Sequence, residues 1–166
     1  MTEQVEPIYV RALRTLVYVL VIISGIGIFV MIGTICADVV LRRFDSPIVG
    51  AYDIVKMAGA ITLACALPYT TAVKGHVAIE YFFHKLNRTG RVLVDTIVRL
   101  FGIGLFGFFA WRSFIYGLQM RQTGQVSQTL EWPIFWLPWV IGFCCVVVLL
   151  VIVYNLLHPD KEMIKP

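Results

Sequence analysis

Three histidines come first among the residues that could do chemistry, because imidazole is a common ligand of haem iron and other metals. A haem-binding membrane bundle holds its axial imidazoles inside the membrane, on facing helices. His76 and His84 instead flank one end of the second apolar segment, and His158 ends the fourth. On a single helix His76 and His84 would lie roughly 80° apart, which makes them a poor pair. We therefore expect no haem, metal ion or other cofactor.

The glycines from Gly102 to Gly107 match the dinucleotide-binding fingerprint G-x-G-x-x-G letter for letter. That fingerprint requires a preceding strand and a helix that opens at the glycines. Here it falls within an apolar segment, so we interpret the match as accidental. Glycines at such positions allow close helix contact, as do the small-x-x-x-small pairs Gly33/Ala37 and Ala60/Ala64.

Carboxylates decide whether the chain can move a solute by itself. A four-helix exporter of this size needs a carboxylate within the membrane to exchange protons against its substrate. All the candidate carboxylates instead fall at the ends of apolar segments, namely Asp38, Asp53, Glu80 and Glu131. We expect a chain that neither transports alone nor acts as an enzyme.

Two arginines lie within the third apolar segment, where a charge is costly unless it has a purpose. Arg99 and Arg112 are 13 residues apart, roughly 20 Å along a helix, which is less than the apolar thickness of a bilayer. Arg99 can pair with Asp95 at i and i+4. Snorkelling, an asymmetric helix position and contact with a protein partner all remain open for these arginines.

The elements that must position these residues are long apolar segments. Of 166 residues, 59% are hydrophobic and only 14% are charged, with a mean hydropathy of +0.83, whereas soluble domains carry about 25% charged residues. We predict an all-α membrane protein forming one domain, 1–166. Its four transmembrane helices are expected at 15–37, 51–73, 92–118 and 132–157. The four cysteines fall in apolar segments and are expected to be small buried residues: Cys36, Cys65, Cys144 and Cys145.

The distribution of Lys and Arg predicts the orientation. Nine lie on the side that holds both termini and the second connection, and five lie on the other side. The positive-inside rule therefore places both termini in the cytoplasm. We attribute the net charge of +4 to this cytoplasmic bias, which places cations beside anionic membrane lipid. No basic cluster in the sequence indicates nucleic-acid binding.

A short amphipathic stretch follows the second segment at 78–88. Its apolar residues recur at i, i+3, i+4 and i+7, opposite a charged face. This pattern predicts a helix lying in the cytoplasmic membrane interface. A folded loop packed on a partner is the alternative.

The fourth segment opens with Trp132, Trp136 and Trp139, with Pro133 in the expected first turn. Tryptophan favours the headgroup region and proline is tolerated in a first helical turn. We interpret these residues as an aromatic anchor at the outer surface, and a docking surface for a periplasmic protein is the alternative.

The order of these signals resembles the small membrane subunit of tripartite ATP-independent periplasmic (TRAP) transporters, the DctQ-type family. The resemblance covers most of the chain and rests on four stretches: 38–44 (DVVLRRF), 46–53 (SPIVGAYD), 74–80 (KGHVAIE) and 124–133 (GQVSQTLEWP). The family often has Glu in place of Asp53 and Asp in place of Glu80, so both departures keep the carboxylate.

The resemblance implies a bacterial inner-membrane subunit that associates with a much larger DctM-type subunit, which holds the substrate and sodium sites. A secreted DctP-type protein binds the solute, often an organic acid, and docks on the outer face. The outer partner interface would then include Arg42, Arg43, Asp53, Ser127, Trp132 and Pro133. On the inner side and in the third helix, His76, Glu80, Arg99 and Arg112 would serve partner contact or structure.

Two other functions stay open from the sequence. A membrane anchor subunit of a redox complex would show haem absorbance or quinone-linked activity. An autonomous four-helix exporter would transport as a homo-oligomer.

Overall fold

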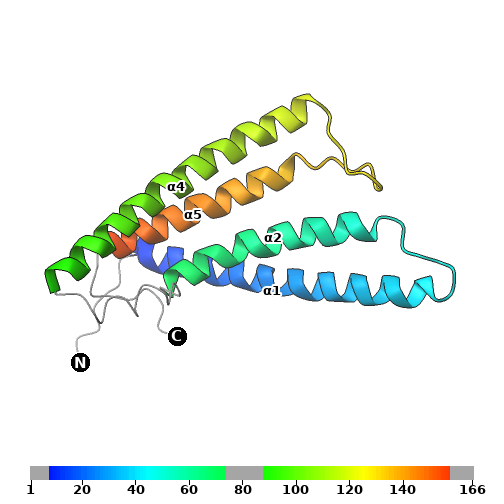
Figure 1. The fold of residues 1–166 in the computed structure, drawn as a ribbon, viewed down its shortest axis with the longest axis horizontal. Helices are drawn as coiled ribbons and strands as arrows, with labels where there is room; N and C mark the ends of the chain where they lie inside the picture. Colours follow the sequence, from blue (N-terminus) through cyan, green and yellow to red (C-terminus); the bar gives the residue numbers. More distant parts are fainter. Residues whose placement is uncertain (1–7, 74–87, 158–166) are drawn as a thin grey trace.

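The computed structural model describes residues 8–73 and 88–157, and these ranges contain four helices and no β-strand. The helices are α1 (Ile8–Arg42), α2 (Ala51–Ala72), α4 (Arg88–Gln122) and α5 (Trp136–Leu157) (Figure 1). All four are long and apolar enough to cross a membrane, which confirms the prediction of an all-α membrane protein with four spanning helices. Residues 78–87, most of the expected interfacial helix, lie outside the described residues.

The helices fall into two lengths. α1 and α4 have 35 residues each, about 52 Å of helix, whereas α2 and α5 have 22 each, about 33 Å. The longer pair extends beyond the predicted bounds because uncharged runs reveal only the part of a helix that lies in lipid. α1 and α4 each continue through charged residues that water or headgroups can solvate.

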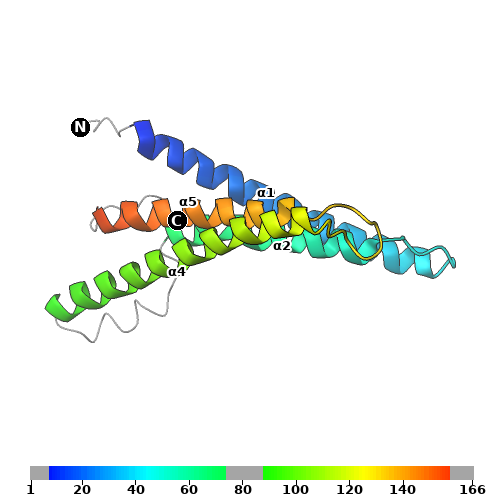
Figure 2. The same cartoon turned by 90° about the horizontal axis from the view of Figure 1, so that it is seen from above.

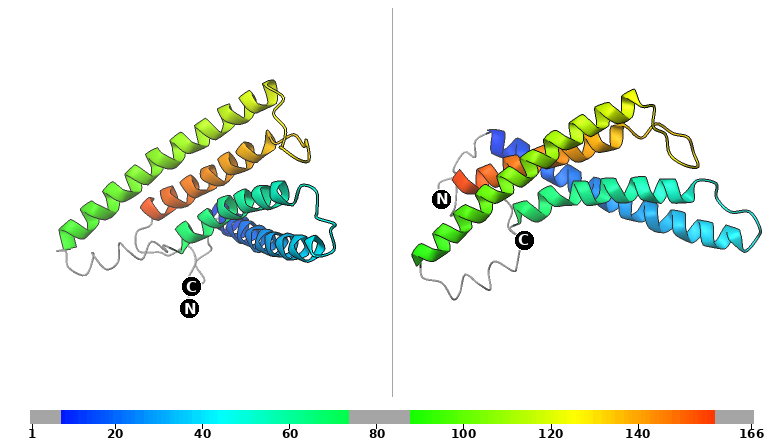
Figure 3. Two further views of the ribbon diagram at one scale, coloured as in Figure 1. Left: turned by 45° about the vertical axis from the view of Figure 1, so that its right-hand side comes forward. Right: turned by 45° about the horizontal axis from the view of Figure 1, so that its top comes forward.

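The helices form two antiparallel hairpins that are joined side by side. α1 packs on α2, α4 packs on α5, and contact between α2 and α5 connects the hairpins. The order across the molecule is therefore α1, α2, α5, α4, with α4 at one edge (Figure 3). Seen from above, the first turns of α1 and α4 diverge to opposite sides (Figure 2). Ile8 and Leu157 lie at one end, and the connections 43–50 and 123–135 lie at the other, called here the loop end.

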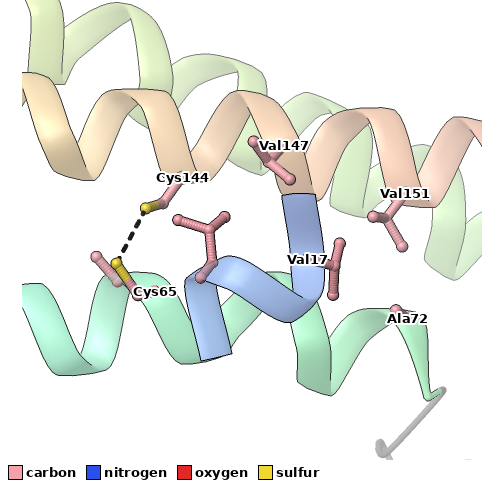
Figure 4. Packing of buried hydrophobic residues seen from close by; sticks show 8 residues of the cluster. Val17, Cys65, Ala72, Cys144, Val147 and Val151 are labelled. Carbon is pink, nitrogen blue, oxygen red and sulfur yellow. Dashed lines mark hydrogen bonds between the residues drawn. The ribbon is translucent and has the colours of Figure 1, made fainter. Parts of the chain in front are cut away.

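The core lies where α1, α2 and α5 meet. Val17, Cys65, Cys144, Val147 and Val151 are all buried there, and Figure 4 shows Cys65 of α2 facing Cys144 of α5. Their Sγ atoms are 3.8 Å apart. Three of the four cysteines are buried as predicted, and the exception is Cys36, which is exposed on α1.

Small residues allow the helix pairs to approach closely. A Cβ on Gly27 of α1 would collide with the Thr62 side chain of α2, and the Ser24 hydroxyl donates to the Thr62 carbonyl at 3.0 Å. The fingerprint-like glycines lie well inside α4, so they do not open a helix as a nucleotide site requires. Gly33, expected at a close contact, has no neighbouring atom within 4 Å of an added Cβ among the described residues.

Candidate functional site

The α1–α2 connection is organised by the carboxylate of Asp38. It accepts hydrogen bonds from Arg42 Nε at 2.8 Å and from the main-chain N–H of Ile48 at 3.0 Å. Asp38 is buried although Arg42 is 66% exposed. The Asp38 carboxylate thus joins the last turn of α1 to the returning chain, because it accepts hydrogen bonds from both segments.

The α4–α5 connection turns back on itself before α5 begins. Ser127 donates its main-chain N–H to the Trp132 carbonyl at 2.9 Å, and the Ser127 hydroxyl accepts from the Trp132 N–H at 3.3 Å. Val126 and Pro133 form an isolated antiparallel bridge. Glu131 adopts φ 53°, a left-handed conformation that closes this tight turn.

This turn is fixed to the start of α2 by Asp53. Oδ2 of Asp53 accepts main-chain hydrogen bonds from Thr129 at 2.8 Å and from Leu130 at 3.1 Å. Asp53 is only 3% exposed, and a carboxylate in a first helical turn is also favoured by the helix dipole. The Leu130 side chain covers Gly50 so closely that a Cβ there would collide with it. We call Asp53, Ser127, Trp132 and Pro133, with the amides of Thr129 and Leu130, the Asp53 clasp.

The family model described as "Tripartite ATP-independent periplasmic transporters, DctQ component" matches residues 31–162. The chain belongs to the DctQ family. No curated protein and no solved structure matches it. It is therefore the small membrane subunit of a TRAP transporter, a multi-pass protein of the inner membrane. The matched range includes the Asp38 contacts and the whole Asp53 clasp.

Four residues predicted at the outer interface of this DctQ subunit meet in the clasp: Asp53, Ser127, Trp132 and Pro133. Asp53 and Ser127 are buried there, whereas Trp132 is 60% exposed. Arg42 ends α1 and Arg43 begins the other loop-end connection, and both are exposed. Contact of these residues with a partner stays a prediction, but the Asp53 carboxylate is already engaged within the chain.

The start of the last helix differs from the predicted bound of residue 132. Trp132 and Pro133 precede α5, which begins at Trp136. Pro133 has no N–H to donate, and its bridge with Val126 keeps this part of the chain extended.

The two predicted arginines of α4 have different environments. Arg99 is half-buried and donates to the Asn155 carbonyl of α5, so it is held within the chain. Arg112 is exposed on the helix. His76 and Glu80 lie outside the described residues, as do His84 and His158. Among the described residues, no group of three or more His, Cys, Asp or Glu side chains lies close enough to hold a metal ion.

Sequence reasoning missed the role of Asp38. Its spacing of i to i+4 from Arg42 predicts the ion pair, but nothing in the sequence indicates the hydrogen bond to Ile48. The partners of Asp53 were also missed, because residue types do not indicate which backbone amides will donate to a distant carboxylate. Only the fold brings Thr129 and Leu130 to a carboxylate 76 and 77 residues away.

Proposed function

We propose that this DctQ subunit braces the large DctM-type permease and presents its loop end to the DctP-type binding protein. The complex would take up an organic acid by coupling to sodium, with substrate and sodium held in the large subunit. This chain would need no cofactor and catalyse no reaction of its own. The membership of the DctQ family carries this proposal.

The loop end would face the periplasm and both termini the cytoplasm. The distribution of Lys and Arg supports this orientation. The antiparallel hairpins support the placement of both termini on the same side of the membrane, because the start of α1 and the end of α5 lie at one end of the molecule.

The hydrogen-bonded backbone of the loop end supports a docking role. Both connections are held by carboxylates that accept main-chain hydrogen bonds, so their exposed side chains are presented from fixed backbone. Fixed surfaces lose less conformational entropy on binding than mobile ones. Exposed cations and aromatic rings, the residue types that favour protein interfaces, are both present: Arg42, Arg43, Phe44, Tyr52 and Trp132.

Reconstituted transport tests the proposal. The chain, the large subunit and the binding protein are combined in liposomes with an inward sodium gradient, using the organic acid that a thermal-shift panel identifies as the binding protein's ligand. We expect uptake to require all three proteins and sodium. Uptake by the large subunit and binding protein alone, at the full rate, would refute the bracing role.

Docking is tested by the double substitution Arg42→Ala and Arg43→Ala in the same liposomes. We expect several-fold more binding protein to be needed for half-maximal uptake, with the rate recovered at excess binding protein. Arg11→Ala, which removes an exposed arginine at the opposite end, is the matched control. Unchanged uptake by the double variant at limiting binding protein would count against docking at this loop.

A further inference from the structure

Three arginines of α4 have side chains that the structure describes, and they differ in how their charge is satisfied. Arg121 lies 5.8 Å from the ring centroid of Phe135, where a cation–π contact is favourable. Arg99 donates to the Asn155 carbonyl. In the part of the chain that the structure describes, Arg112 has no hydrogen bond, ion pair or ring contact. Arg112 is therefore the exception among these three arginines.

Arg112 points away from the rest of the molecule. The side of α4 that faces α5 is marked by buried Ala110 and by Gly117, where a Cβ would collide with Trp139. Arg112 follows Ala110 by two residues, a rotation of about 200°. Its side chain thus leaves α4 on the side opposite α5.

The depth of Arg112 is also unusual for an unpaired arginine. It lies ten residues before Gln122, the end of α4, or about 15 Å along the helix. At its level in α5 is Gly142, which faces Ala110 and Ser113 and lies about 9 Å from the helix start at Trp136. Arginines that snorkel are normally found near helix ends, whereas Arg112 lies well inside the apolar span Thr96–Gln122.

Aromatic side chains surround Arg112 on the same exposed side. Within one turn of it, the exposed fractions reach 55% for Phe108 and 62% for Trp111. The complete surface, called here the α4 outer face, consists of Leu105, Phe108, Phe109, Trp111, Arg112 and Tyr116, and all are exposed. It combines a large apolar area with one unsatisfied cation.

We infer that the α4 outer face packs against a transmembrane helix of the large subunit, and that Arg112 pairs there with an Asp or Glu of that helix. This inference rests on the proposed function and deepens it. Charge complementarity selects the occupant, because a guanidinium at this depth requires an acceptor that the apolar part of a lipid lacks. A carboxylate accepts a guanidinium in a bidentate geometry, while the aromatic rings around it exclude water.

Copurification of the co-expressed subunits from mild detergent tests the inference. Arg112→Leu should lower the yield of large subunit bound per small subunit about tenfold or more, because it leaves the partner's carboxylate in the membrane without a counter-charge. Arg112→Lys should retain most binding. Arg121→Leu, which removes a cation that is satisfied within the chain, is the matched control and should copurify like the wild type. Thermal unfolding of each small-subunit variant alone identifies loss of fold.

The outcomes separate the inference from the function on which it rests. If the wild type fails to copurify with the large subunit, the proposed function fails. If the wild type and Arg112→Leu copurify equally, only the inference is overturned; an accompanying loss of bound anionic lipid would assign Arg112 to a phosphate instead. Recovery of Arg112→Glu by an Asp or Glu to Arg exchange in the large subunit would identify the paired residue and support the inference.

Discussion

The Asp53 carboxylate and the Thr129 amide are joined by a 2.8 Å hydrogen bond that spans 76 residues of sequence. Asp53 lies in the first turn of α2. Thr129 belongs to the turn before α5, so this bond connects the two hairpins at the loop end. The same oxygen, Oδ2, accepts a second hydrogen bond from the Leu130 amide at 3.1 Å. The core connects the same hairpins deeper in the molecule through α2 and α5.

Asp53→Ala should release the α4–α5 connection. It removes the charged acceptor of two amide hydrogen bonds, and a hydrogen bond to a charged group contributes about 1.5–3 kcal/mol. Hydrogen exchange measured by mass spectrometry should therefore become about tenfold to hundredfold faster at Thr129 and Leu130. Asp38→Ala is the control and should accelerate Ile48 alone. Equal acceleration of both connections in either variant would show that the two carboxylates do not act independently.

Arg42→Ala should change stability by less than about 1 kcal/mol, because an ion pair with one exposed partner contributes little. Arg42 is 66% exposed, and Asp38 keeps its bond to the Ile48 amide when the arginine is lost. Thermal unfolding in detergent measures the effect, with Asp38→Ala as the more damaging comparison. A larger loss for Arg42→Ala than for Asp38→Ala would reverse this ranking.

Gly27→Leu should weaken the α1–α2 pair by about 1–3 kcal/mol, the usual cost of overpacking. The added side chain would collide with the Thr62 side chain of α2. Gly25→Leu is a matched control two residues away, since an added Cβ there meets no atom within 4 Å. Unfolding in increasing denaturing detergent compares the two. Equal sensitivity of both variants would contradict the close approach at Gly27.

Mild oxidation should join Cys65 to Cys144 within one chain. Their Sγ atoms are 3.8 Å apart, so a small side-chain movement allows a bond when copper phenanthroline with oxygen removes two electrons and two protons. The experiment uses a protein with Cys36→Ser and Cys145→Ser, and peptide mass spectrometry detects the crosslink. Adding Cys65→Ser should abolish it. Preferential pairing of Cys65 with Cys145 in the wild type would place α5 in a different rotation.

The class of fold could be predicted because it depends on composition over long segments. Four apolar runs and their lengths determine four spans, and the bounds of α2 came within one residue of 51–73. The bounds of α1 and α4 were too short because a helix does not end where its lipid-facing residues end. The early expected start of the last helix has a local cause, the extended turn around Pro133.

The candidate site could be predicted only in part. The stretches around Asp53, Ser127 and Trp132 were selected from the sequence, and the structure brings these residues into one cluster. That Asp53 is buried and bonds to main-chain amides could not be foreseen, because its acceptor role depends on the path of a distant turn. The acceptor of Arg99 could not be foreseen for the same reason, since it is a main-chain carbonyl on another helix.

The packing of α5 against the first hairpin constrains how the protein is made. α5 leaves the ribosome after the other three described helices, yet it supplies Cys144, Val147 and Val151 to the core that α1 and α2 share. The first hairpin can pair in the membrane as soon as α2 is inserted, in keeping with N-terminal segments folding first. Its core-facing surface, around Val17 and Cys65, then stays exposed to lipid until α5 is inserted. A chain interrupted before Trp136 would therefore carry an inserted hairpin with an uncovered surface, a ready target for membrane quality control.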